Sequence, residues 1–287
     1  MSSQSLFAPR DGQTPSGTSV TQPPTSRSGA PASPLVRPTP IEPITLVTGL
    51  YYSSAQQLDV YAPREPGLWP IVVILHGLGD SRSDWSPLAK AIAPRGVVVF
   101  NVGFRAEEVQ RPGGVEDAAC AVRFARATGS GYGGDPARIT VLGISAGAVH
   151  GALVALAGDR FGGDCAEGGV SALPAALVGV AGPYDPTLCP GDPRPALRQT
   201  DPARYDAMNP FTHLGGNPSL RVSLLHGADD ADVPPGGSIG FHAALTAAGY
   251  AATLTLLEGY GHEIPLPTSR AFDAIVRETL KVARAQR

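Results

Sequence analysis

Six near-continuous apolar runs, separated by longer helical patterns, constrain the fold of this chain more than any other feature. The runs are IVVILH (71–76), GVVVFNV (96–102), RITVLGI (138–144), AALVGVAG (175–182), LRVSLLHG (220–227) and AATLTLLEG (251–259). Continuous rather than alternating apolarity is typical of parallel strands that are covered on both faces. Helical patterns occur at 84–94, 115–129, 146–157, 237–249 and 268–285. The alternation predicts an α/β fold with a mostly parallel, doubly wound sheet and helices on both faces.

The N-terminal part of the chain divides into a polar tail and the start of the sheet. The runs ITLVT (44–48) and QLDVYAP (57–63) predict an antiparallel pair, which brings the sheet to about eight strands. Residues 1–43 contain nine Pro and eight Ser and show no apolar periodicity. Such a segment cannot bury enough apolar surface to offset its ordering entropy, so we expect a disordered tail. Residues 44–287 are then predicted to form the folded domain.

Charge and hydropathy exclude some classes of partner. The 22 basic and 25 acidic side chains are scattered and give a net charge of −3. This distribution contains no cluster of basic residues that could bind nucleic acid or an anionic membrane surface. No run of 18 apolar residues is present, so no membrane span is expected. The N-terminus also lacks the apolar core of a signal peptide. We therefore expect a protein that is cytoplasmic, or secreted with its signal peptide already removed. The oligomeric state is left open.

A Gly-x-Ser-x-Gly pattern occurs twice, as GISAG around Ser145 and as GGSIG around Ser238. Ser145 directly follows a predicted buried strand and precedes a helical run, so it is expected on a tight strand-turn-helix. Flanking glycines are needed there because a Cβ at Gly143 or Gly147 would collide with neighbouring backbone. The turn exposes the hydroxyl and leaves the N–H of Ala146 free for an oxyanion. Ser238 follows VPPGG, which is no central strand, and is predicted to cap a helix.

A nucleophilic serine requires a base and a third group that fixes the tautomer of the base. The chain has six histidines: His76, His150, His213, His226, His242 and His262. His262 lies in a Gly-flanked loop after the last strand, at the sheet edge where doubly wound folds bind ligands, and is the expected base. The acid should follow the strand LRVSLLHG, where Asp229, Asp230 and Asp232 compete. Spacing alone does not choose among these three carboxylates.

The chain resembles the α/β-hydrolases, which use the order Ser, Asp, His. The resemblance lies in the segments LDVYAP, VVILHGLGD, GGDPARITVLGISAGA, LLHGADDADVPP and LEGYGHE. They look like a carboxylesterase or a feruloyl or acetyl-xylan esterase, related to the hormone-sensitive-lipase group. The resemblance covers about residues 44 to 285. It implies a catalytic domain with the triad Ser145, Asp230 and His262, because the acid of this family lies four residues after the His of the HG-x-x-D stretch.

The stretch HGLG is similar to the oxyanion stretch of the family, which usually reads HGGG. The resemblance implies that backbone N–H groups of Leu78 and Gly79 join that of Ala146 in holding the oxyanion. Leu78 stands where a second Gly is usual and would narrow the pocket. His76 is interpreted as an orienting residue that hydrogen-bonds backbone.

The substrate pocket is expected to be open. The segments 159–174 and 183–218 are loop-like and lie where such enzymes carry a lid, but they are short, so a small cap or none is predicted. Tyr184, Val233 and Ile144 are candidates to line the pocket.

The resemblance implies a serine carboxylic-ester hydrolase that forms an acyl-enzyme. Short to medium acyl or aryl esters, either small or polymer-linked, are the expected substrates, and no metal or organic cofactor is expected. A serine peptidase of the prolyl-oligopeptidase type and a non-catalytic binding protein on the same fold are the alternatives.

The three cysteines form no metal-ligand spacing. Cys120 lies in an apolar helical pattern and is expected in the core. Cys165 and Cys189 flank one irregular segment and could form a disulfide in an oxidising compartment.

Overall fold

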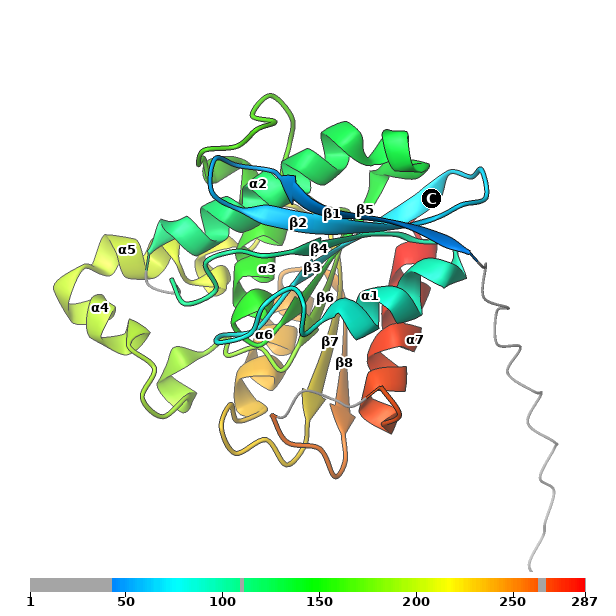
Figure 1. The fold of residues 1–287 in the computed structure, drawn as a ribbon. Coiled ribbons are helices and arrows are strands. Elements are labelled where there is room, and N and C mark those ends of the chain that lie inside the picture. Colours follow the sequence, from blue (N-terminus) through cyan, green and yellow to red (C-terminus); the bar gives the residue numbers. More distant parts are fainter. Residues whose placement is uncertain (1–42, 109–110, 263–266, 287) are drawn as a thin grey trace, which may run out of the picture. The chain divides into compact units, whose positions relative to one another are not determined.

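The centre of the fold is an eight-stranded sheet of order β1-β2-β4-β3-β5-β6-β7-β8 (Figure 1). The structure, a computed structural model, describes residues 43–108, 111–262 and 267–286. The strands are β1 (Ile44–Tyr51), β2 (Gln57–Pro63), β3 (Trp69–Leu75), β4 (Val98–Val102), β5 (Gly134–Ile144), β6 (Ala176–Val180), β7 (Arg221–Gly227) and β8 (Ala251–Leu257). β1 pairs antiparallel with β2, and β2 antiparallel with β4, whereas every other pair is parallel. The predicted α/β-hydrolase fold class is confirmed.

Helices cover both faces of this sheet, as Figure 1 shows. They are α1 (Ser86–Ile92), α2 (Pro112–Thr128), α3 (Ala146–Ala157), α4 (Arg194–Thr200), α5 (Pro202–Ala207), α6 (Gly236–Ala247) and α7 (Arg270–Arg284). One buried cluster joins the sheet to α2, α3 and α6, and a second joins it to α1 and α7. Successive residues of β3 alternate between the two clusters: Val73 belongs to the first, and Val72 and Ile74 to the second. Two-sided burial explains why the central strands are apolar throughout.

Two segments differ from the sequence-based expectations. The stretch 183–218, expected as loop, contains the short helices α4 and α5, and no residue of α5 is buried. β8, expected as a buried strand, lies at the edge of the sheet and alternates between exposed and half-buried residues. Apolar composition predicted a strand there correctly, but it cannot distinguish an edge position from a central one.

The cysteines pair differently from the expectation. A disulfide joins Cys120 of α2 to Cys165, with Cα atoms 4.9 Å apart, and Cys189 is a free thiol. Cys120 is buried as expected, but its helix packs against the segment that carries Cys165. The suggested Cys165–Cys189 pair is therefore wrong.

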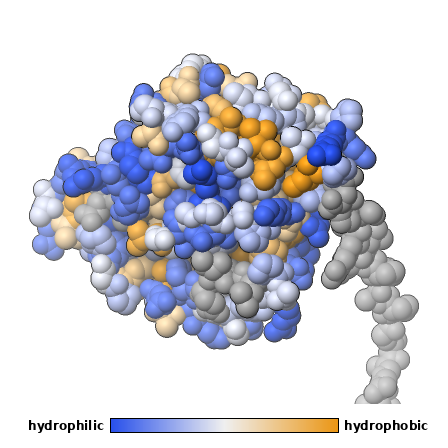
Figure 2. Space-filling model, in the orientation of Figure 1, coloured by the Kyte–Doolittle hydropathy of each residue, from blue (hydrophilic) through white to orange (hydrophobic). Residues whose placement is uncertain are grey.

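Exposed apolar side chains are dispersed over the surface. The large ones are Leu46, Tyr51, Leu68, Leu78, Val170, Leu188, Ile239 and Leu256. On the face drawn in Figure 2, hydrophobic residues form small patches within a mostly hydrophilic surface. Among the described residues, no helix is long and apolar enough to cross a membrane. The predicted tail, residues 1–43, lies outside the described residues except for Pro43.

Candidate active site

Ser145 occupies a strained turn between β5 and α3. Its φ of 52° and ψ of −117° lie outside the regions that residues with a Cβ normally adopt. The turn is held by a hydrogen bond from the Ser145 N–H to the carbonyl of Val180, at 2.8 Å. A Cβ on Gly143 would overlap the carbonyl of Gly147, and one on Gly147 would overlap the carbonyl of Leu75. The glycines flanking Ser145 are thus required by close backbone packing, as the sequence indicates.

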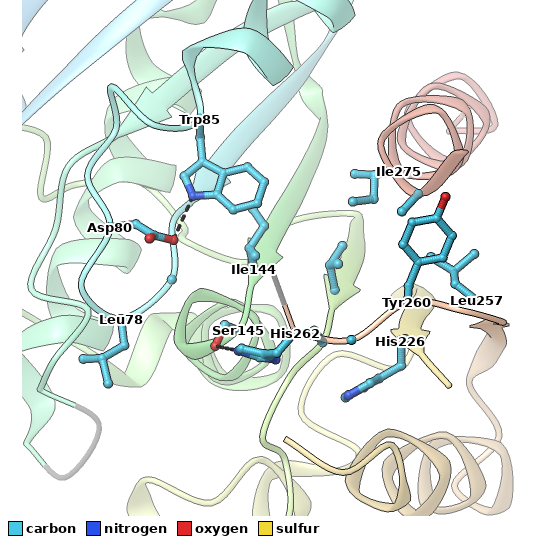
Figure 3. A pocket seen from close by; sticks show the side chains of 16 residues that line it. Leu78, Asp80, Trp85, Ile144, Ser145, His226, Leu257, Tyr260, His262 and Ile275 are labelled. Carbon is cyan, nitrogen blue, oxygen red and sulfur yellow. Dashed lines mark hydrogen bonds between the residues drawn. The ribbon is translucent and has the colours of Figure 1, made fainter. Parts of the chain in front are cut away.

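The structure brings Ser145, His262 and Asp230 into one hydrogen-bonded chain. Ser145 Oγ lies 2.9 Å from His262 Nε2 (Figure 3), and His262 Nδ1 lies 2.7 Å from Asp230 Oδ2. A carboxylate can only accept, so Nδ1 of the neutral ring carries the proton and donates to Asp230. Nε2 is then an acceptor for the Ser145 hydroxyl. This arrangement allows His262 to remove a proton from Ser145.

Asp230 is distinguished from its two acidic neighbours by burial and hydrogen bonding. Its side chain is fully buried, and its Oδ1 accepts hydrogen bonds from the backbone N–H groups of Asp232, at 3.1 Å, and Val233, at 2.8 Å. Asp229 and Asp232 have exposed side chains. The loop after β7 wraps around one carboxylate and directs it toward His262.

The loop after β3 passes close to Ser145. A Cβ on Gly77 would lie 3.4 Å from the Cβ of Ser145 and 2.8 Å from Asp80 Oδ2, so only glycine fits at this approach. The N–H groups of Leu78 and Ala146 donate no backbone hydrogen bond within the described ranges. Leu78 lines the pocket with its side chain 62% exposed, whereas Gly79 is absent from the pocket wall. The Gly77–Leu78 segment therefore lies beside the nucleophile.

An aromatic stack supports this loop from behind. The His76 ring packs on Phe104, with centroids 4.8 Å apart, and the same Phe104 meets His150 edge-on at 5.4 Å. His76 Nδ1 donates to the carbonyl of Gly77 at 2.9 Å, which agrees with the predicted orienting role. Burial lowers the pKa of His76, so the neutral ring is favoured. The bidentate ion pair of Arg105 with Asp117, at 2.8 Å, anchors the segment that carries Phe104.

A cavity of about 130 Å³ opens beside Ser145. Its wall is mostly apolar and consists of Gly77, Leu78, Asp80, Trp85, Ile144, Ser145, Val180, Ala181, His226, Gly227, Leu257, Tyr260, Gly261, His262, Ala271 and Ile275. Figure 3 shows Trp85 and Ile144 above Ser145 and His262, and Tyr260, Leu257 and Ile275 to the right of them. Trp85 Nε1 donates to Asp80 Oδ2 at 3.1 Å, which satisfies the indole N–H.

Two of the three predicted pocket residues lie elsewhere. Ile144 lines the cavity, but Tyr184 is fully buried and stacks on Phe241 of α6, with centroids 4.4 Å apart. Val233 is absent from the cavity wall and contributes backbone groups to the loop that holds Asp230.

Two polar residues near the site were missed or misplaced by the sequence analysis. His226 lies at the carboxyl end of β7 and reaches the acid, although only His262 was expected there. Ser238 is the third residue of α6 rather than its N-cap, which is Pro235, and its Oγ bonds His226 Nδ1 at 2.7 Å. His226 lies in the motif LLHGADDADVPP and Ser238 in GGSIG, but neither motif indicates that these side chains are buried.

Comparison with known proteins places the chain in one family and finds relatives that are described as esterases. The BD-FAE family model matches residues 58–245, which contain Ser145 and Asp230. A probable isoprenylcysteine alpha-carbonyl methylesterase of Oryza sativa subsp. japonica is 28% identical over 260 residues, covering 80% of this chain and 61% of that protein. A second rice protein of the same description is 28% identical over 237 residues, covering 72% of this chain and 54% of that protein. The chain thus spans little more than half of these relatives.

Solved structures share the fold. A carbohydrate esterase from gut microbiota superposes with a TM-score of 0.69 at 20% identity, covering 84% of this chain and 96% of that one. An esterase of Thermogutta terrifontis with bound butyrate gives a TM-score of 0.70 at 20% identity, covering 83% of this chain and 93% of that one. At this identity the similarity establishes a common fold.

Proposed function

The chain belongs to the BD-FAE family of α/β-hydrolases, and we propose that it is a serine carboxylic-ester hydrolase that works through an acyl-enzyme. The observation that carries the proposal is the continuous path from Ser145 Oγ through His262, at 2.9 and 2.7 Å, to the buried Asp230. A serine hydroxyl is a weak nucleophile, and this geometry supplies the base and the group that orients it. The similar proteins are described as esterases, which does not favour a peptidase or a binding protein.

Acylation begins when Ser145 Oγ attacks the ester carbonyl and His262 Nε2 takes its proton. Asp230 stabilises the imidazolium through Nδ1–H without itself being protonated. The backbone N–H groups of Leu78 and Ala146 are the proposed donors to the oxyanion, and one such donor typically contributes about 3–4 kcal/mol. His262 then gives its proton to the departing alkoxide, which leaves an acyl ester on Ser145.

Deacylation repeats the same proton transfers with water. His262 Nε2 removes a proton from a water molecule that attacks the acyl carbonyl, and it returns this proton to Ser145 Oγ as the tetrahedral intermediate collapses. His262 therefore carries each proton, from Ser145 to the leaving alkoxide in acylation and from water to Ser145 in deacylation.

The cavity supports short acyl groups as preferred substrates. A dry cavity of about 150 Å³ lined by Leu, Ile and Phe holds one benzene molecule, so the 130 Å³ here accommodates a group of that size or smaller. Ile144, Val180 and Ile275 provide an apolar surface for it. Asp80 adds a carboxylate to the wall, which disfavours acyl groups that carry a negative charge. Longer chains must extend past the exposed Leu78.

A panel of p-nitrophenyl esters from acetate to laurate, together with a feruloyl ester, tests this proposal. We expect kcat/KM to rise from acetate to butyrate and to rise no further toward laurate, because roughly 0.8 kcal/mol per methylene is gained only while the chain is buried in the cavity. Ser145→Ala should abolish turnover, whereas Ser130→Ala, at an exposed serine of a remote turn, should match the wild type. A matched anilide measures amide hydrolysis. Preference for the anilide, or full activity of Ser145→Ala, would contradict the proposal.

A further inference from the structure

His226 is a buried histidine beside the triad that the mechanism above does not use. Its side chain is fully buried at the end of β7. Its Nε2 lies 2.8 Å from the carbonyl of Val233 and 3.2 Å from Asp230 Oδ2. The Val233 carbonyl accepts the hydrogen bond, so Nε2 carries a proton, and Asp230 Oδ2 lies beside this N–H as a close electrostatic contact.

Ser238 fixes the other nitrogen of this ring. Burial lowers the pKa of His226, which favours the neutral ring, so Nδ1 has no proton when Nε2 has one. The Ser238 hydroxyl, 2.7 Å away and itself 1% exposed, must then donate to Nδ1. The tautomer of His226 is thereby determined by its partners on both sides.

Asp230 Oδ2 therefore lies against two imidazole rings: it accepts the hydrogen bond of His262 and faces the N–H of His226. His262 Nδ1 lies 2.7 Å from this oxygen and His226 Nε2 lies 3.2 Å from it, while the two backbone N–H groups bind Oδ1. One chain of close polar contacts thus connects the serine of GGSIG with the serine of GISAG, through His226, Asp230 and His262. The charged or titratable groups that face His226 are Asp230, on the loop after β7, and His262, on the loop after β8.

We propose that His226, held by Ser238, is a positioning residue that fixes the orientation of the Asp230 carboxylate and shares its negative charge with His262. The inference rests on the proposed ester hydrolysis. The His226 donor lies on the same oxygen as His262, so it limits rotation of the carboxyl group and withdraws charge from the bond to His262. Without that donor, the carboxylate would attract the His262 imidazolium more strongly and would be held less firmly.

Two amide substitutions at His226 test whether the N–H beside Asp230 matters or whether any polar side chain suffices. In His226→Gln the side-chain nitrogen reaches the position of Nε2 and still donates toward Asp230, whereas the shorter His226→Asn reaches only the position of Nδ1. The measurement is kcat and kcat/KM for p-nitrophenyl butyrate as a function of pH. We expect His226→Asn to shift the acidic limb of kcat/KM upward by about 0.5–1 pH unit, because the imidazolium is stabilised. Its kcat should fall by about tenfold with KM changed by less than about twofold.

The conservative variant His226→Gln should restore the wild-type pH profile. His226→Gln should keep the acidic limb within about 0.2 pH unit of the wild type, because its amide replaces the lost donor. Ser238→Ala should shift the limb in the same direction as His226→Asn but less, and Ser238→Thr should restore it. If thermal melting shows that His226→Asn does not fold, the Ser238 pair decides the question.

The outcomes distinguish this inference from the proposed function. Superimposable pH profiles of an active wild type and of the folded variants would overturn the positioning role and leave the esterase proposal intact. A folded wild type without activity on any ester of the panel would instead contradict the proposed function, and the inference with it.

Discussion

Ser145 and Ser238 share a pentapeptide pattern but differ in backbone and neighbours. Ser145 has a φ of 52°, lines a cavity and bonds a base, whereas Ser238 is buried in α6 and bonds His226, which contacts the acid. The preceding strand was the feature that separated them in the sequence. What the sequence could not show was that the second serine belongs to the same network.

His150 is a buried histidine whose protonation should destabilise the fold. It is fully buried in α3, its Nε2 donates to the carbonyl of Ala106 at 3.3 Å, and its Nδ1 has no partner among the described residues. Burial lowers its pKa to about 4. Because the unfolded value is about 6.5, the unfolded chain binds more protons than the folded one between these two values, and stability falls as pH falls through this window.

We predict that the free energy of unfolding contributed by His150 decreases by about 2 kcal/mol between pH 7 and pH 4.5. His150→Gln keeps a donor toward Ala106 and cannot titrate. Its free energy of unfolding should therefore fall by about 2 kcal/mol less than that of the wild type over the same pH range. Urea denaturation of both proteins at the two pH values measures the difference. Equal declines would show that His150 does not stay neutral in the folded state.

At the scale of elements, the site depends on the contact between the start of α3 and the end of β3. Gly147 lies where a Cβ would overlap the carbonyls of Leu75 and His76, so α3 approaches β3 without any intervening side chain. This contact brings the turn that carries Ser145 next to Gly77. The distance between nucleophile and oxyanion loop is therefore set by two backbones rather than by side chains.

Gly147→Ala should lower the free energy of unfolding by about 2–3 kcal/mol, because the backbones must separate to admit a methyl group. Gly131→Ala is the matched control, since a Cβ there meets nothing within 4 Å, and its stability should change by no more than about 0.5 kcal/mol. Chemical denaturation measures both. A tolerated Gly147→Ala would mean that α3 is not packed this closely.

The order of strands and helices was predictable from the sequence, whereas the lateral contacts were not. Apolar runs in the sequence indicated β5, β7 and β8, and the positions after these strands led to Ser145, Asp230 and His262. The Cys120–Cys165 bridge and the displacement of Tyr184 into the core depend on which segments pack side by side. No local pattern carries that information, so these two features required the structure.

At the scale of the whole described fold, the candidate site is assembled from four loops at one edge of the sheet. Gly77 follows β3, Ser145 follows β5, Asp230 follows β7 and His262 follows β8. Parallel strands end at the same edge, so residues far apart in sequence converge without any long insertion. The predicted small cap agrees with α4 and α5, which contribute no residue to the cavity wall.

The central claim is that Ser145 alone becomes acylated, and covalent labelling tests it most directly. The protein is treated with a fluorophosphonate probe, and the modified peptide is located by mass spectrometry in wild type, Ser145→Ala, Ser238→Ala and Ser130→Ala. We expect one label per chain on Ser145, its loss only in Ser145→Ala, and slower labelling of Ser238→Ala. A label on Ser238, or an unlabelled wild type that is folded, would contradict it.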